Sequence, residues 1–126
     1  MSQELIQSSD APAPIGPYSQ AVRSGKTLYC SGQIALDPST GNLVDGDAAT
    51  QAEQVMKNLG AVLKAAGCEY GDVVKTTIFL VDMNDFAAVN AVYGKYFDAA
   101  KPARSTVAVA ALPRGARVEI EAIART

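Results

Sequence analysis

Apolar residues recur at helical spacing in the middle of the chain. From Asp47 onward they return every three to four positions, and Gly67 supplies a stop signal. This stripe consists of Ala52, Val55, Met56, Leu59, Val62, Leu63 and Ala66. A second helix is predicted after Asp82 or Asn84, either of which can cap it, and before Pro102, which cannot continue it. Its apolar stripe consists of Phe86, Val89, Tyr93 and Phe97.

The segments around these helices have the pattern of β-strands. Residues 18–33 predict a hairpin, with Ser24-Gly25 as its two-residue turn. Residues 73–81 are rich in β-branched side chains. Residues 105–112 and 117–124 alternate as two further strands, separated by the turn sequence PRGA. The expected order is therefore ββαβαββ, an α+β domain whose two helices can cover one face of a sheet.

The remaining segments predict irregular structure. Residues 1–17 hold three of the 6 prolines and predict an extended lead-in, and residues 36–47 predict a polar loop. At 126 residues, the chain has the size of one ordinary domain, so we expect a single domain over residues 1–126.

Both faces of the predicted sheet are apolar. One face of the strand near the C-terminus carries Thr106, Ala108, Ala110 and Leu112, and the other carries Val107, Val109 and Ala111. The earlier strand places Val74, Ile78 and Leu80 on one face and Phe79 and Val81 on the other. Two helices can cover only one side, so the sheet either curls on itself or buries its second face against other subunits. We expect an oligomer.

Composition and charge exclude several classes of protein. Hydrophobic residues make up 48% of the chain, charged residues 19%, and the net charge is −2. The basic residues form no stripe beyond Arg114–Arg117, which argues against a nucleic-acid partner. No apolar run is long enough for a membrane helix, and the first residues lack the layout of a signal peptide. Cys30 and Cys68 have no CxxC spacing, which fits ordinary thiols in a reducing, cytoplasmic setting.

The chain contains no histidine, which narrows the chemistry. A Ser-His or Cys-His nucleophile and an imidazole metal site are excluded, and the phosphate-binding glycine motifs are missing. We expect no metal and no cofactor. Arg104 is either a solvated strand end or a fixed cation that can bind a carboxylate through two hydrogen bonds. Glu119 and Glu121 share one strand face, and each is either a structural ion-pair partner or an acid–base group with a disturbed pKa.

Four weaker candidates accompany these charges. Tyr18, in GPYS, can pack locally or close over a small ligand. Ser31 and Gly32 can end a strand or let an anion approach the backbone. Asn90, beside the apolar stripe of the second helix, is either a surface residue or a site residue.

At these same residues the sequence resembles the Rid (YjgF) family of reactive enamine/imine deaminases. The shared motifs are IGPYSQAV at 15–22, SGQIALDPSTGNLV at 31–44, QAEQVMKNL at 51–59, VVKTTIFLVDMNDFAAVN at 73–90, PARSTV at 102–107 and VEIEAIA at 118–124. The resemblance implies a chorismate-mutase-like fold and a homotrimer with clefts between subunits. It also implies hydrolysis of 2-imino acids, such as 2-iminobutanoate and 2-iminopropanoate, to 2-keto acids and ammonia. Two alternatives stay open: a specialised relative acting on another enamine or aminoacrylate, and a non-catalytic keto-acid-binding or chaperone-like module.

The resemblance also assigns roles to residues. It implies that Arg104 clamps the substrate carboxylate and that Glu119 orients or deprotonates the attacking water. The family commonly has a cysteine two residues after the arginine, where this chain has Thr106, and the backbone there can still bind water. The same resemblance places four further residues in the cleft: Tyr18, Ser31, Gly32 and Asn90.

Overall fold

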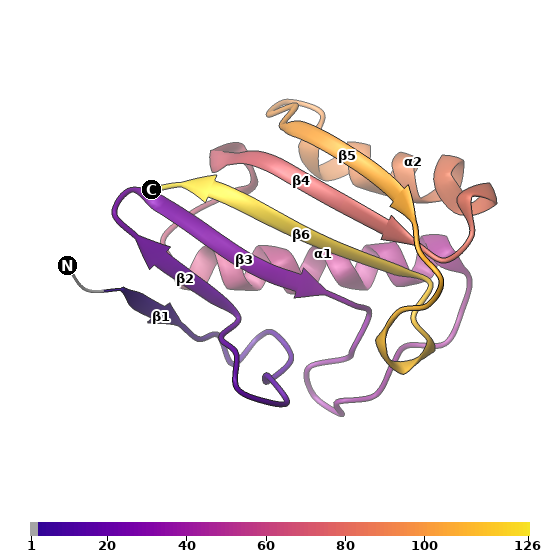
Figure 1. Cartoon of the computed structure of the whole chain (residues 1–126), viewed down its shortest axis with the longest axis horizontal. Coiled ribbons are helices and arrows are strands. Elements are labelled where there is room, and N and C mark those ends of the chain that lie inside the picture. Colours follow the sequence, from indigo (N-terminus) through magenta and orange to yellow (C-terminus); the bar gives the residue numbers. More distant parts are fainter. Residues whose placement is uncertain (1–2) are drawn as a thin grey trace.

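The chain folds around a six-stranded mixed sheet (Figure 1). The structure is a computed structural model that describes residues 3–126. The strands are β1 Glu4–Ile6, β2 Ala21–Ser24, β3 Thr27–Gln33, β4 Val73–Leu80, β5 Ala103–Ala108 and β6 Val118–Arg125, in the spatial order β1-β2-β3-β6-β4-β5. All neighbours are antiparallel except β4 and β5. The C-terminal strand β6 therefore lies in the middle of the sheet, between β3 and β4.

Two helices, α1 (Ala48–Ala65) and α2 (Phe86–Phe97), lie on one side of this sheet (Figure 1). Helix α1 begins after Asp47, whose carboxylate accepts a hydrogen bond from the Thr50 N–H at 2.9 Å. Its apolar stripe packs on β3 and β6 and against α2. The fold class expected from the sequence, an α+β sheet with both helices on one face, is confirmed.

The core fills the space between the sheet and the helices. Alternate residues of β6 are buried there, and the remaining ones are half-buried or exposed on the other side. The largest fully buried apolar side chains are Phe97, Leu28, Met56, Leu59, Leu63, Ile78, Leu80 and Ile120. The predicted stripe of α1 is buried throughout, so its helical periodicity identified the core face correctly.

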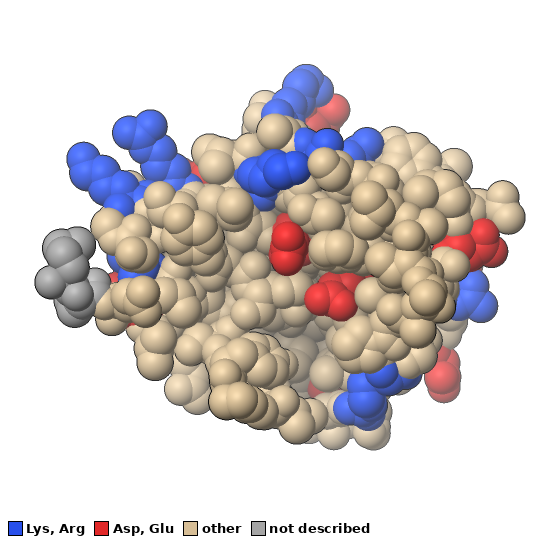
Figure 2. All heavy atoms as spheres, viewed as in Figure 1, with Lys and Arg blue, Asp and Glu red and all other residues tan. Residues whose placement is uncertain are grey.

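The opposite face of the sheet has no covering element among residues 3–126 (Figure 1). We call this the uncovered face. Figure 2 shows that it is largely uncharged over the strands, apart from two acidic groups near its centre and basic groups toward β4 and β5. Tyr29 and Val107 remain 52% and 41% exposed there, and Phe79 is half-buried. The face is apolar, as the sequence predicts.

In strand β4, one residue lies on a different face of the sheet than the sequence predicts. The sequence groups Val74 with Ile78 and Leu80, yet Val74 is 51% exposed while the other two are buried. The pairing of β4 with β6 shifts register between Val73 and Lys75. Because a bulge adds one residue to the strand, the alternation of faces changes at that point.

Four boundaries also differ from the sequence-based expectation. The lead-in contains the short strand β1, and β5 ends at Ala108 rather than at residue 112. Ser24 pairs with Thr27, so the turn of the hairpin is residues 25–26, one position later than predicted. Asp82 caps the short 3₁₀ turn Met83–Asp85 that leads into α2, and not α2 itself. Within residues 3–126, no helix is long and apolar enough to cross a membrane.

Replacement of Leu59 by alanine tests the assigned core. Leu59 is fully buried in α1, so its truncation removes apolar contacts and leaves a cavity beneath the sheet. We expect the free energy of unfolding to fall by about 2–5 kcal/mol, measured by chemical denaturation. Leu5→Ala is the matched control, because Leu5 is 67% exposed on the edge strand. A loss in the control as large as that in Leu59→Ala would contradict the assignment.

Candidate functional site in two parts

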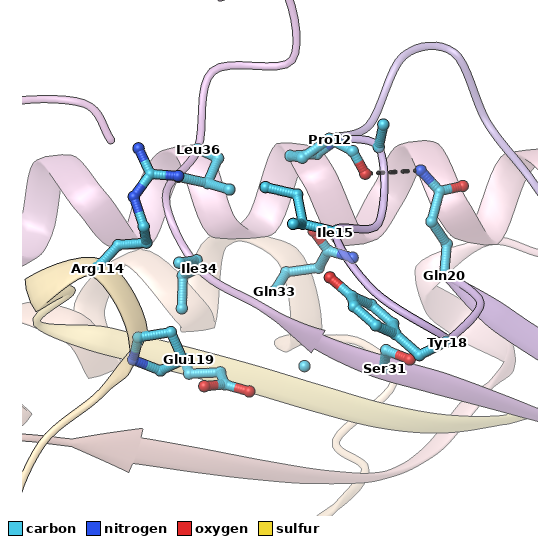
Figure 3. A pocket seen from close by; sticks show the side chains of 13 residues that line it. Pro12, Ile15, Tyr18, Gln20, Ser31, Gln33, Ile34, Leu36, Arg114 and Glu119 are labelled. Atoms are coloured by element: carbon cyan, nitrogen blue, oxygen red, sulfur yellow. Dashed lines mark hydrogen bonds between the residues drawn. The ribbon is translucent and has the colours of Figure 1, made fainter. Parts of the chain in front are cut away.

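A cavity of about 490 Å³ opens at the end of β3, where the chain leaves the sheet (Figure 3). Figure 3 shows Glu119 and Arg114 at one side of this cavity and Tyr18 and Gln20 at the other. We call it the β3 cavity. Its lining consists of Pro12, Ala13, Ile15, Tyr18, Gln20, Ser31, Gly32, Gln33, Ile34, Leu36, Pro113, Arg114 and Glu119. Its size falls in the range of small-molecule sites, and its lining is mostly apolar with a few polar groups.

A bulge in β3 shapes the floor of the β3 cavity. The pairing of β3 with β6 shifts between Cys30 and Gln33, which leaves Ser31 and Gly32 outside the regular ladder. A Cβ atom on Gly32 would lie 2.0 Å from Oε2 of Glu119. Only glycine therefore leaves room for the carboxylate in its present position.

The wall that carries Tyr18 is fixed to this bulge. The Ser31 hydroxyl donates to the Ser19 carbonyl at 2.6 Å, and the Ser31 N–H donates to the Gln20 carbonyl at 2.9 Å. The Ser31 hydroxyl proton is thus already used, although its oxygen can still accept a hydrogen bond. Tyr18 itself is 54% exposed at the mouth of the cavity.

Arg104 lies away from this cavity, at the start of the edge strand β5. Its guanidinium carbon lies 4.9 Å from the centre of the Tyr93 ring and 5.5 Å from that of Phe86. Its Nη1 donates to Oδ1 of Asn90 at 2.7 Å. Among residues 3–126, Arg104 forms no ion pair with a carboxylate. The group is held by α2 and keeps hydrogen-bond donors for an anion.

Arg104 and Glu119 leave the sheet on opposite faces. Arg104 pairs with Thr76, a buried residue that faces the helices, whereas Glu119 pairs with Phe79 on the uncovered face. Arg104 and Asn90 line a second depression of about 420 Å³, which shares no lining residue with the β3 cavity. One subunit therefore brings Tyr18, Ser31, Gly32 and Glu119 together and keeps Arg104 and Asn90 apart from them.

Thr106 lies two residues after Arg104 on the helix side of β5, opposite Ile78. It lines neither of the two depressions. Its hydroxyl oxygen is buried and has no hydrogen-bond partner within the described part of the chain. The structure thus places an unsatisfied hydroxyl on the same face of β5 as the candidate cation.

Several lining residues were not singled out from the sequence. Arg114 adds a positive charge on the same side of the cavity as Glu119, and its backbone has a φ of 61°. Gln20 and Gln33 are 2% and 7% exposed. The sequence carried no signal for Gln33, because alternation along β3 groups it with Tyr29 and Ser31. The bulge between Cys30 and Gln33 is what turns this side chain inward.

Comparison with known proteins decides the family. The family model described as Endoribonuclease L-PSP matches residues 8–126. A structure from Yersinia pestis, described as a protein of unknown function of the conserved Rid protein family, is 49% identical and superposes with a TM-score of 0.97. It covers 99% of this chain, which in turn covers 100% of it. The chain belongs to the Rid family.

Two further members of the Rid family carry functional descriptions. The mouse protein named 2-iminobutanoate/2-iminopropanoate deaminase is 58% identical, over 97% of this chain and 90% of its own length. The structure of Escherichia coli TdcF with bound serine is 43% identical and covers 98% of each chain, with a TM-score of 0.92. The similarity thus extends over nearly the whole of each relative.

The carboxyl group of Glu119 in this Rid-family subunit has a shifted pKa. Burial in the β3 cavity raises its pKa above the usual value, and the neighbouring charge of Glu121 raises the pKa further. The folded protein therefore binds a proton at Glu119 more readily than the unfolded chain does. Stability contributed by the protonated form is lost as the pH rises through the folded-state pKa.

Substitution of Glu119 by glutamine tests this electrostatic assignment. The neutral amide has no ionisation penalty, so the variant should gain stability relative to the wild type as the pH rises. The difference should level off at pH values well below about 4, where Glu119 of the wild type is protonated in the folded and in the unfolded chain. Denaturant unfolding between acid and neutral pH measures it. Glu121→Gln is the matched variant and should lower the pKa of Glu119 in an NMR titration; a pH-independent stability difference for Glu119→Gln would contradict the assignment.

Proposed function

We propose that this protein hydrolyses 2-imino acids and their enamine tautomers, such as 2-iminobutanoate and 2-iminopropanoate, to 2-keto acids and ammonia. The observation that supports this most directly is Arg104, a guanidinium held on aromatic rings with donors free for a carboxylate. The name of the full-length mouse relative supports the same activity. The substrates would come from pyridoxal-dependent dehydratases acting on serine or threonine, in the cytoplasm. Neither a nucleic acid nor a membrane is required.

The active site that we propose forms between subunits of a homotrimer. Arg104 and Glu119 point to opposite faces of one sheet, so a carboxylate clamp and a base can meet only if a neighbour supplies one of them. The apolar uncovered face, with Tyr29 and Val107 exposed, gives a surface for that association. In this arrangement the β3 cavity of one subunit faces the Arg104 edge of the next.

The chemistry follows from these positions. Arg104 binds the substrate carboxylate with two hydrogen bonds, while Asn90 fixes the guanidinium and Thr106 offers its hydroxyl or backbone beside it. Tyr18 closes the cavity, and the Ser31–Gly32 bulge leaves room for the reacting carbon near Glu119. Glu119, made more basic by burial, accepts a proton from water as the oxygen attacks C2. The nitrogen gains the two protons that the water loses: Glu119 returns one, and the added hydroxyl group gives the other as the C–N bond breaks. Ammonia and the keto acid leave, and Glu119 is ionised again.

Loss of Arg104 should nearly abolish the activity. Arg104→Ala should lower kcat/KM by roughly 30-fold or more. The proposed assembly would bury the contact between Arg104 and the carboxylate, and losing one partner of a buried charge contact costs about 2–5 kcal/mol. The assay generates imino acids in situ with an amino-acid oxidase and follows keto-acid release above the spontaneous rate. Arg104→Lys keeps the positive charge but not the two parallel hydrogen bonds. Its kcat/KM should lie between that of the wild type and that of Arg104→Ala. Arg125→Ala, at the exposed end of β6, is the control.

Co-expression of two inactive variants, Arg104→Ala and Glu119→Gln, tests whether the site is shared. In randomly mixed trimers about a quarter of the interfaces would pair an intact Arg104 with an intact Glu119, so about a quarter of the activity should return. A site contained within one subunit would recover nothing. Binding of 2-ketobutanoate to the wild type with no turnover of any imino acid would instead identify a binding module.

A charge on the uncovered face should prevent assembly. Val107 lies opposite Phe79 on this face, and Val107→Asp would place a carboxylate in the proposed interface, where an unpaired charge is costly. We expect monomers by sedimentation equilibrium, with loss of deaminase activity. Lys26→Asp, in the exposed turn between β2 and β3, should leave the trimer intact. A wild-type protein that sediments as a monomer would contradict the proposal.

A further inference from the structure

Gln20 is a buried side chain at the base of the wall that carries Tyr18. It is 2% exposed and directly precedes β2. Its Oε1 accepts a hydrogen bond from the Ser8 N–H at 2.6 Å, and its Nε2 donates to the carbonyls of Pro12 at 2.8 Å and Ser8 at 3.1 Å. A third carbonyl, that of Ala11, lies 3.5 Å from the same nitrogen. The side-chain amide of Gln20 therefore forms hydrogen bonds with the backbone at both ends of residues 8–12.

The amide of Gln20 has no donor left for a ligand. Its NH₂ group carries two hydrogens, which the Ser8 and Pro12 carbonyls already accept. Figure 3 shows the bond to Pro12 at the rim of the β3 cavity, with Ile15 and Tyr18 beside the open space. Gln20 thus acts on the cavity through the backbone that it holds.

The segment between Pro12 and Tyr18, which we call the wall loop, is fixed at its ends. Gln20 holds the first end, and Ser31 holds the second through the Ser19 carbonyl. Between them, Ile15 is 76% and Tyr18 54% exposed, so few side-chain contacts fix the middle of the loop. The loop turns at a glycine with a φ of 124°, a conformation that side chains rarely adopt. The positions of the two fixed ends therefore determine where the side chains of the loop lie.

We infer that Gln20 is a positioning residue that sets the wall loop, and with it Ile15 and Tyr18, at the width that a small imino acid requires. The inference rests on the proposed function for its substrate. Without the amide, two backbone carbonyls lose their donor, and the start of the loop must move to find water. Arg104 and Glu119 belong to other elements and stay in place. Substrate binding should weaken while the chemical step is kept.

Gln20→Glu gives a test that a merely structural role would not pass. A protonated carboxyl group can still donate to one carbonyl and accept from the Ser8 N–H, whereas the ionised form has no donor and faces carbonyl oxygens. The ratio of its KM to that of the wild type should be near one at low pH. It should rise roughly tenfold as the new carboxyl group ionises, with kcat nearly unchanged. A ratio that does not change with pH, or a fall in kcat at constant KM, would overturn the inference.

Hydrogen–deuterium exchange supplies a readout that needs no turnover. In Gln20→Leu, amide exchange should become faster in peptides covering residues 5–20 and stay unchanged in α1. Tyr70→Phe is the control, because it removes a side-chain hydrogen bond to the Met56 carbonyl on the helix side. It should lower stability without changing KM or exchange in the wall loop.

The two measurements separate failure of this inference from failure of the proposed function. Unchanged exchange in residues 5–20 of Gln20→Leu would overturn the role of Gln20 even in an active deaminase. A wild-type protein without imine turnover would overturn the proposed function. In that case, local exchange changes in Gln20→Leu, together with weaker binding of 2-ketobutanoate, would still support Gln20 as the residue that sets the wall.

Discussion

Burial on only one side of the sheet is the constraint on which the other features depend. Both helices pack on the same face, where Leu28, Ile78 and Ile120 are fully buried. Apolar side chains on the opposite face remain in water within a single subunit. Each Å² of apolar surface removed from water contributes about 25 cal/mol, so a face of this kind favours association. The association of subunits that we propose follows from this imbalance.

The same constraint gives Glu119 its chemistry. Glu119 lies on the uncovered face, at the edge of the β3 cavity, where it is neither free in water nor paired with a cation in the described residues. The bulge in β3 brings Gly32 against it, and the absent Cβ gives the carboxylate its place. A partly desolvated carboxyl group with a raised pKa is what general-base catalysis in neutral water uses.

Arg104 shows the complementary arrangement at the sheet edge. Strand β5 is the edge strand next to β4, and α2 supplies the two aromatic rings and the side-chain oxygen of Asn90 that hold the guanidinium. Cation and carboxylate are thus separated by the sheet itself, and a neighbouring subunit has to join them. We propose that this separation couples activity to assembly. The wall loop then forms the side of the cleft that can adapt to the substrate, because Gln20 and Ser31 fix only its ends.

The sequence by itself determined the helices, the alternation of β6 and the residue types of the site. These signals are local: the stripe of α1 repeats within one element, and the long motifs around Tyr18, Arg104 and Glu119 identify the family. The tertiary structure alone decided the strand order, which places β6 between β3 and β4, and the pairing of the short strand β1. It also decided the bulge that turns Val74 outward and the division of the site residues between two faces. Strand pairing joins residues far apart in the chain, and a bulge changes which face a residue occupies without altering the pattern of residue types, so neither can be read from periodicity.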